Sequence, residues 1–389
     1  MRAIYALVVL LAFTFELQAA NSAFCEKFAT GEFKEESYLA LTRSVFPGKK
    51  VGFDRCEEIY SNLKNRGGLV LTGRFPNIPK LRDFRVIAEF SHYIVLTLDD
   101  QDIEDIGLVR NFSKLRVLSL SGNQIKNLSV LRSLPELRQL RLDRNNFGAA
   151  FKTLPPLPLL ESINLDENAL TDIQRLQEFK ALQHLHLRKN ALTSLRGIEN
   201  LTEIIDLSLD DNQLPSLSAI SRFRKLGTLS AVGNQLRDLS PLAQITSLKA
   251  MNLAENQIED LSPIAWLTQL ENLTAPKNRI SEVRPLRGHP QLAYLELADN
   301  QIQDVSALSE IPQLESLVLA GNPVIELNPL VGHPVLRELA ISLTLIPREI
   351  RSLQKMTHVG KLYVRSEQKS EALRQIRQAL PDTRLQLYF

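Results

Sequence analysis

One asparagine recurs through most of this 389-residue chain at a nearly constant interval. Consecutive copies are 22 residues apart, except for one interval of 23 between Asn145 and Asn168. The ten copies are Asn123, Asn145, Asn168, Asn190, Asn212, Asn234, Asn256, Asn278, Asn300 and Asn322. Each belongs to the phrase leucine-x-x-leucine-x-leucine-x-x-asparagine-x-leucine. A fixed period of this length predicts stacked repeats.

The phrase predicts a short strand followed by a turn. In the copy at 248–258, Met251 and Leu253 alternate as they would in a strand with one buried face. A 22-residue unit cannot bury its apolar edge alone, so successive units must stack with their strands paired in parallel. A buried asparagine in each turn would donate to and accept from unpaired backbone groups. The sequence therefore predicts a solenoid with an asparagine ladder.

The segment that returns to the next strand is also periodic. Leu236, Leu239, Leu242 and Ile245 are three residues apart, a spacing that favours a 3₁₀ or irregular return. Prolines share one position in four returns, and a polar residue before three of them is expected to cap the turn. These prolines are Pro241, Pro263, Pro285 and Pro329, and the expected caps are Ser240, Ser262 and Asn328. Acidic residues such as Asp238 and Asp260 are expected to be solvated and near backbone N–H groups.

The phrase and its period resemble the leucine-rich repeat family, in the 22-residue class shared by bacterial internalins and a eukaryotic nuclear regulator of a protein phosphatase. The resemblance covers most of the chain. It implies an α/β solenoid with a parallel β-sheet on the concave face and 3₁₀ or irregular returns on the convex face.

Residues 1–23 have the pattern of a secretory signal peptide, with Arg2, an apolar run and small residues through Ala23. The run is too short to span a membrane, and a buried N-terminal helix is the alternative interpretation. We expect an N-terminal cap over 24–92, repeats over 93–365, and a C-terminal cap helix with a final strand over 366–389. The helix is expected at 366–380.

Two cysteines, Cys25 and Cys56, follow the signal-like segment. In an exported protein, two cysteines so placed favour a disulfide, with two free thiols as the alternative. Helices are expected from Glu35 to Phe46 and from an N-cap at Asp54, and 69–71 is expected to form the first strand. Some exported bacterial leucine-rich repeat proteins have a similar paired-cysteine cap.

The chain has no recognisable catalytic motif. Its six histidines form no H-E-x-x-H pattern, and there is no phosphate-binding glycine loop, no G-x-S-x-G sequence and no spare cysteine. We therefore expect a non-enzymatic protein with no cofactor. With 46 basic and 44 acidic residues, the net charge of +2 gives no field that favours nucleic acid or an anionic membrane.

Function is then expected on the strand face, where the variable positions of the phrase point outward. The first half of the series is charged, and the second half, from Thr228 to Pro276, has small neutral side chains. Tyr294, Glu296 and Tyr363 close the series. The predicted partner-binding residues are Arg141, Asp143, Asn164, Asp166, His184, His186, Arg188, Asp206, Ser208, Asp210 and Tyr294.

Two other interpretations of the charged stretch stay open. Asp166, Arg188 and Asp210 are neighbours on successive strands and would pair with one another across the sheet. A metal site at His184, His186 and Asp206 is disfavoured, because two histidines of one strand lie roughly 7 Å apart.

The predicted function is that of a secreted or periplasmic protein that binds a protein or peptide, of unknown identity, through its concave face. One alternative is an intracellular scaffold resembling the phosphatase regulator. Another is a glycan or surface-polymer binder that uses Asn164, His186 and Ser208. Neither nucleic acid binding nor stable membrane insertion is expected.

Overall fold

The computed structural model describes residues 23–30, 32–33, 35–45, 55–72, 80, 84–365 and 385–388. The chain divides into two compact units, Met1–Asn168 and Ala169–Phe389. Of the predicted signal peptide, all but Ala23 lies outside the described residues, as does the helix expected at 366–380.

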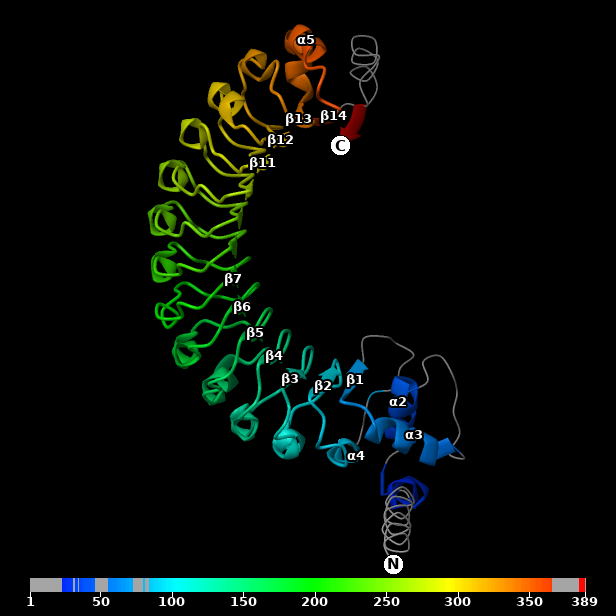
Figure 1. Cartoon of the computed structure of the whole chain (residues 1–389). Coiled ribbons are helices and arrows are strands. Elements are labelled where there is room, and N and C mark those ends of the chain that lie inside the picture. Colours follow the sequence, from blue (N-terminus) through cyan, green and yellow to red (C-terminus); the bar gives the residue numbers. More distant parts are fainter. Residues whose placement is uncertain are drawn as a thin grey trace, which may run out of the picture. The chain divides into compact units, whose positions relative to one another are not determined.

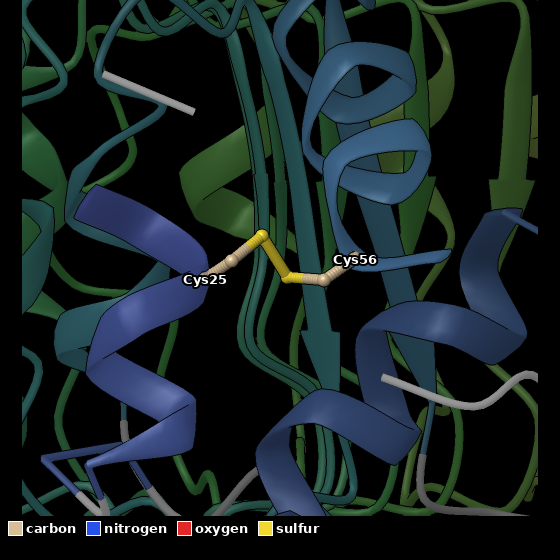
Figure 2. Close-up of a disulfide and its surroundings, with 2 residues drawn as sticks. All are labelled: Cys25 and Cys56. Atoms are coloured by element: carbon tan, nitrogen blue, oxygen red, sulfur yellow. A yellow bond between two sulfur atoms is a disulfide. The ribbon is translucent and has the colours of Figure 1, made fainter. Parts of the chain in front are cut away.

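The first unit begins with short helices, two of which are joined by a disulfide. Residues 23–29 are helical, followed by α2 (Glu35–Val45), α3 (Cys56–Lys64) and α4 (Arg85–Ala88). Cys25 and Cys56 form the predicted disulfide, with their Cα atoms 5.9 Å apart (Figure 2). Both predicted helices are confirmed, but the residue that precedes α3 is Arg55, and Asp54 lies outside the described residues.

Aromatic side chains form the core of this N-terminal segment. The Phe24 ring centroid is 5.4 Å from that of Phe28, 4.6 Å from Tyr60 and 5.7 Å from Phe90. Phe90 stacks on Tyr93, which donates a buried hydrogen bond from its hydroxyl to the Leu63 carbonyl at 2.9 Å. Such rings each bury a large apolar area. The core of this segment is therefore built from aromatic side chains, whereas that of the repeats is built mainly from leucines.

Five parallel strands of the first unit pair in sequence order. They are β1 (Gly68–Thr72), β2 (Val95–Asp99), β3 (Val117–Ser119), β4 (Gln139–Arg141) and β5 (Ser162–Asn164). The returns contain η2 (Gly107–Asn111), η3 (Ser129–Ser133) and η4 (Gly148–Thr153), all 3₁₀ helices. The first strand predicted at 69–71 is confirmed as part of β1.

The second unit repeats the same arrangement, with strands on one side and returns on the other (Figure 1). Its strands are β6 (His184–His186), β7 (Asp206–Ser208), β8 (Thr228–Ser230), β9 (Ala250–Asn252), β10 (Asn272–Thr274), β11 (Tyr294–Glu296), β12 (Ser316–Val318), β13 (Glu338–Ser342), β14 (Lys361–Arg365) and β15 (Leu385–Tyr388). Its 3₁₀ helices are η5 (Gln174–Glu178), η6 (Ser218–Ile220), η7 (Ser240–Leu242), η8 (Ser262–Ile264), η9 (Arg284–Leu286), η10 (Ser306–Glu310), η11 (Asn328–Leu330) and η12 (Leu343–Leu345). The predicted solenoid with parallel strands and 3₁₀ returns is confirmed.

One return differs from the others. After β13 the chain forms the α-helix α5 (Ile346–Lys355). Thr344 stands here at the ladder position, and the spacing to the next strand leucine is 23 residues. The buried Glu349 accepts a hydrogen bond from the Leu327 N–H at 3.0 Å, so the helix is joined to the preceding repeat. Our prediction of a 3₁₀ or irregular return is wrong for this repeat.

The asparagine ladder has the bonding that the sequence predicts. The Asn212 side chain is 7% exposed and donates from Nδ2 to the carbonyls of Leu187 and Leu209, at 2.9 Å each. Its Oδ1 accepts from the Leu192 N–H at 3.1 Å. Each asparagine thus joins its own turn to that of the preceding repeat, which satisfies backbone groups that the turn leaves unpaired.

The predicted serine and asparagine caps are wrong. No side-chain cap bond is made at the start of η7, η8 or η11. In η7 and η8 the acidic residue two positions earlier accepts the N–H instead: Ser240 N lies 2.8 Å from Asp238 Oδ1, and Ser262 N lies 2.7 Å from Asp260 Oδ1. Asp reaches a backbone N–H two residues on, so the serine is left inside the turn. This bond also lowers the pKa of Asp238.

Candidate functional site

Four of the predicted binding residues lie on the strand side of the first unit. Arg141, at the end of β4, is exposed, while Asp143 is half-buried. Asp143 accepts a bond from the Ser121 hydroxyl at 2.5 Å and lies 3.3 Å from Nε of Arg144. The Asn164 side chain accepts the N–H of Asp166 at 2.9 Å. Part of this polar surface is therefore bonded to neighbouring groups of the repeats.

The remaining charged candidates lie on the second unit. His184 and His186 flank the buried Leu185 on β6, and both approach the carboxylate of Asp206 on β7. Oδ2 of Asp206 lies 3.5 Å from Nε2 of His186 and 3.8 Å from Nδ1 of His184. Ser208 follows Asp206 on β7 and is half-buried. Among the residues that the structure describes, no group of three or more His, Cys, Asp or Glu side chains could hold a metal ion.

Asp210 and Arg188 have partners besides those of the predicted ladder of alternating charge. Asp210 accepts the Ser230 hydroxyl at 2.6 Å and the Val232 N–H at 2.9 Å. Nε of Arg188 lies 3.5 Å from the carboxylate of Asp211. The carboxylates of Asp210 and Asp211 therefore already have partners within the protein.

A hollow of about 630 Å³ lies on the strand face of the second unit, over β11 to β14. Figure 1 shows these strands next to one another near the C-terminal end of the repeats. The strand register places Glu296, Val318, Ala340 and Tyr363 in one row across the four strands. We call this hollow the trough. Its lining residues are Glu255, Pro276, Lys277, Tyr294, Glu296, Ala298, Asp299, Ser316, Leu317, Val318, Ala320, Glu338, Ala340, Tyr363 and Arg365.

The two sides of the trough carry tyrosines, and its floor carries small side chains. Tyr294 and Glu296 stand on β11, and Tyr363 stands on β14, three strand spacings away. At about 4.8 Å per spacing, these walls are about 14 Å apart at the backbone. Between them, β12 and β13 present Val318 and Ala340, which are half-buried. The short side chains of Val318 and Ala340 thus leave space open in this row of the two middle strands.

Tyr294 is fixed by its neighbour on the same strand. Its hydroxyl donates to Oε2 of Glu296 at 3.1 Å. Burial, together with the nearby carboxylates of Glu296 and Glu338, raises the pKa of Tyr294 to about 12. The phenol therefore stays protonated at neutral pH and remains a donor to Glu296.

Ion pairs border the trough. Glu255 pairs with Lys277 at 2.7 Å, and Glu338 pairs with Lys361 at 2.5 Å. Arg365 reaches back from β14 to Asp299, with Nη1 2.6 Å from Oδ1. Gly321 makes room for this carboxylate: its φ is +78°, and a Cβ there would lie 2.2 Å from Oδ1 of Asp299. A side chain at 321 would disturb this border.

Of the trough residues, the sequence prediction included only Tyr294. Glu296 and Tyr363 were recognised as outward-facing, but Val318, Ala340 and Arg365 were missed. The available signal was the pair of tyrosines on strands three repeats apart with small residues between them. To recognise this signal, the repeats that contain β11 through β14 must be aligned with one another. This alignment is difficult because the repeats after Asn322 lack the ladder asparagine.

No helix among the described residues is both long and apolar enough to cross a membrane.

Comparisons with known proteins agree with this architecture. A family profile described as leucine-rich repeats in two copies matches residues 113–149. A search of curated protein sequences finds no match.

Among solved structures, the chain is similar to an internalin, InlF, from Listeria monocytogenes, with 27% identity and a TM-score of 0.72. The match covers 84% of this chain and 94% of the internalin. A leucine-rich repeat protein of Leptospira interrogans is 21% identical with a TM-score of 0.62, over 85% of this chain and 97% of that one. The plant peptide hormone receptor RGFR1 in complex with RGF2 shares the fold at 17% identity and a TM-score of 0.55, over 85% of this chain and 63% of the receptor.

Proposed function

Because the chain is a leucine-rich repeat protein, we propose that it binds a protein or peptide through the concave, strand-lined face of its solenoid. The observation that carries this proposal is the trough over β11 to β14. It combines aromatic walls, a small apolar floor and a charged border. Interfaces are typically organised in this way, with a desolvated centre and a polar rim.

An extended peptide is the ligand that suits this surface. The trough is open along a sheet whose side chains alternate between the core and the outside, so it can receive a protruding side chain. A structure of the same fold, the plant receptor RGFR1, is in complex with RGF2, and the fold is therefore compatible with peptide binding.

The charged residues predicted from the sequence remain part of the proposal as secondary contacts. On the second unit, His186 is half-buried beside Asp206. Arg141 is exposed on the first unit and stays a separate prediction. Exposed polar groups at the margin of an interface usually affect its specificity and association rate more than its affinity. We therefore assign the main contribution to the trough.

We further propose that the protein is exported, to the cell surface or beyond or to the periplasm. The signal-like pattern of residues 1–23 and the Cys25–Cys56 disulfide support this location. The disulfide also argues against the intracellular scaffold. Alkylation of the protein recovered from its native compartment, followed by intact-mass measurement, tests this point: an unlabelled protein that lacks the first residues is expected, and two labelled thiols would contradict it.

A peptide selection tests the binding face. Random peptides displayed on phage are selected on the purified protein, and the selected peptides are titrated against Val318→Glu, which places a charge on the trough floor. Thr268→Glu adds the same charge to an exposed position in a return and serves as the matched control. We expect Val318→Glu to remove binding and Thr268→Glu to preserve it, with unchanged melting temperatures for both.

The opposite pattern, or equal binding to both variants, would overturn the proposal. A glycan array probed with the same three proteins separates the polymer-binding alternative. Glycan binding that is lost in Val318→Glu, with no peptide selected, would replace the peptide by a glycan as the ligand class.

A further inference from the structure

The acidic groups of the trough are not equally compensated. Its lining contains four carboxylates, and three of them have a basic partner: Glu255 with Lys277, Glu338 with Lys361, and Asp299 with Arg365. Glu296 is the exception among these described residues, because its bonded partner is the neutral hydroxyl of Tyr294. The trough therefore keeps one net negative charge at the β11 wall.

The strand register explains why Glu296 lacks a basic neighbour. Its lateral neighbours are Thr274 on β10 and Val318 on β12. Neither can neutralise a carboxylate, and next in the row after Val318 comes Ala340. The Tyr294 hydroxyl holds one oxygen of Glu296 at 3.1 Å, which orients the group but leaves its charge in place. A half-buried carboxylate beside an apolar floor would gain from a cationic ligand, because attraction is stronger where water is partly excluded.

The space beside Glu296 suits a long side chain with an apolar stem. Val318 and Ala340 extend from Glu296 toward Tyr363 and form a floor about 14 Å wide between the walls. Arginine and lysine cover apolar surface with their methylene stems and keep a charged end for a polar partner.

We propose that the trough receives an arginine side chain of the partner peptide, with the guanidinium on Glu296 and the stem over Val318 and Ala340. This inference rests on the proposed function and names the chemistry of its ligand. Arginine suits the site better than lysine for two reasons. Its planar group binds a carboxylate through two parallel hydrogen bonds. It also stacks on aromatic rings, which Tyr294 and Tyr363 provide at the walls.

A charge-coupling experiment tests the assignment. Peptides from the phage selection are synthesised with their basic residue as arginine or as citrulline, which has nearly the same shape but no charge. Each is titrated by calorimetry against wild type and against Glu296→Gln. Glu326→Gln, at an exposed position in a return, is the matched control.

We expect the selected peptides to share an arginine at one position. Citrulline should weaken binding to wild type by about tenfold or more, and much less to Glu296→Gln, because the partner charge is then already absent. Glu326→Gln should behave as wild type.

Peptides that need an intact trough floor but share no basic residue would overturn this inference and leave the proposed function standing. An equal effect of citrulline on wild type and Glu296→Gln would do the same. Peptides that bind Val318→Glu as well as wild type would instead contradict the proposed function itself.

Discussion

The turns and the strand face of the second unit belong to the same repeats, but their polar groups differ in bonding. Those of the turns are buried and hydrogen-bonded, whereas one carboxylate of the strand face has no basic partner among the described residues. In the turns, Asn212 is buried and bonds backbone groups of its own and the preceding repeat. On the strand face, side chains differ from repeat to repeat, and Glu296 keeps a charge without a basic partner. The side chains that stabilise the solenoid therefore already use their hydrogen-bonding groups within the fold and are not available to a ligand. Residues of the strand face can be substituted without loss of the fold. Substitutions should separate stability from binding along this division.

The disulfide should give the largest effect on stability. We propose that residues 24–92 cap the apolar edge of the first repeat, and in this segment the Cys25–Cys56 bond and the aromatic cluster stand in place of the ladder. Replacing both cysteines with serine is expected to lower the free energy of unfolding of the first unit by about 2–4 kcal/mol, as measured by urea denaturation. Binding of the selected peptides to the second unit should not change. A denaturation curve equal to that of wild type would show that the bond adds no stability.

Loss of one ladder asparagine should have the next largest effect. Asn212→Ala leaves the carbonyls of Leu187 and Leu209 and the Leu192 N–H without their buried partner. We expect a loss of about 1–3 kcal/mol in the free energy of unfolding. Asn200→Ala, at an exposed position in a return, is the control and should have little effect. Equal melting temperatures for the two variants would contradict a structural role for the ladder.

Two buried histidines should give a smaller effect that depends on pH. The Nε2 atoms of His289 and His333 lie 3.3 and 3.0 Å from the carbonyls of Ile264 and Ile311, and among the described residues their Nδ1 atoms have no hydrogen-bond partner. Burial lowers the pKa of both side chains below the ordinary 6.5. The unfolded chain therefore binds protons more readily, and the free energy of unfolding should fall as the pH drops below about 6.5.

The double variant His289→Gln/His333→Gln should weaken this pH dependence between about pH 7.5 and pH 5. The matched control His358→Gln changes an exposed histidine and should retain the wild-type slope. Parallel slopes for wild type and the double variant would show that other groups govern the acid sensitivity.

The predicted charged residues should give the smallest effects. Arg141→Ala and His186→Ala change side chains of the strand face, so each should alter the free energy of unfolding by no more than about 0.5 kcal/mol. His186→Ala should weaken peptide binding, but less than Val318→Glu does, whereas Arg141→Ala tests the first unit separately. Calorimetric titration decides this order. If Arg141→Ala removed binding while Val318→Glu had no effect, the binding site would move to the first unit.

The sequence predicted the fold more completely than the site, for a physical reason. Leucine and asparagine positions repeat because each copy must bury the same apolar edge and satisfy the same turn, so one repeat predicts the next. The trough depends on a single combination of residues that differ between repeats. Charge alone drew attention to Asp210, but its carboxylate is bonded to Ser230. Val318 and Ala340 are small apolar residues that nothing in the sequence alone marks as part of a site. Only the pairing of their strands places them between Tyr294 and Tyr363.

The most direct test of the account is to determine which face contacts the partner. A photoreactive amino acid is placed at 318, on the trough floor, or at 266, where the return carries a tryptophan that is 79% exposed. Both proteins are irradiated with the native surface extract, and crosslinked peptides are identified by mass spectrometry. Binding through the strand face predicts crosslinks to one partner from 318 that a selected peptide displaces, and none of these from 266. Crosslinks to that partner from 266 alone would contradict binding through the strand face.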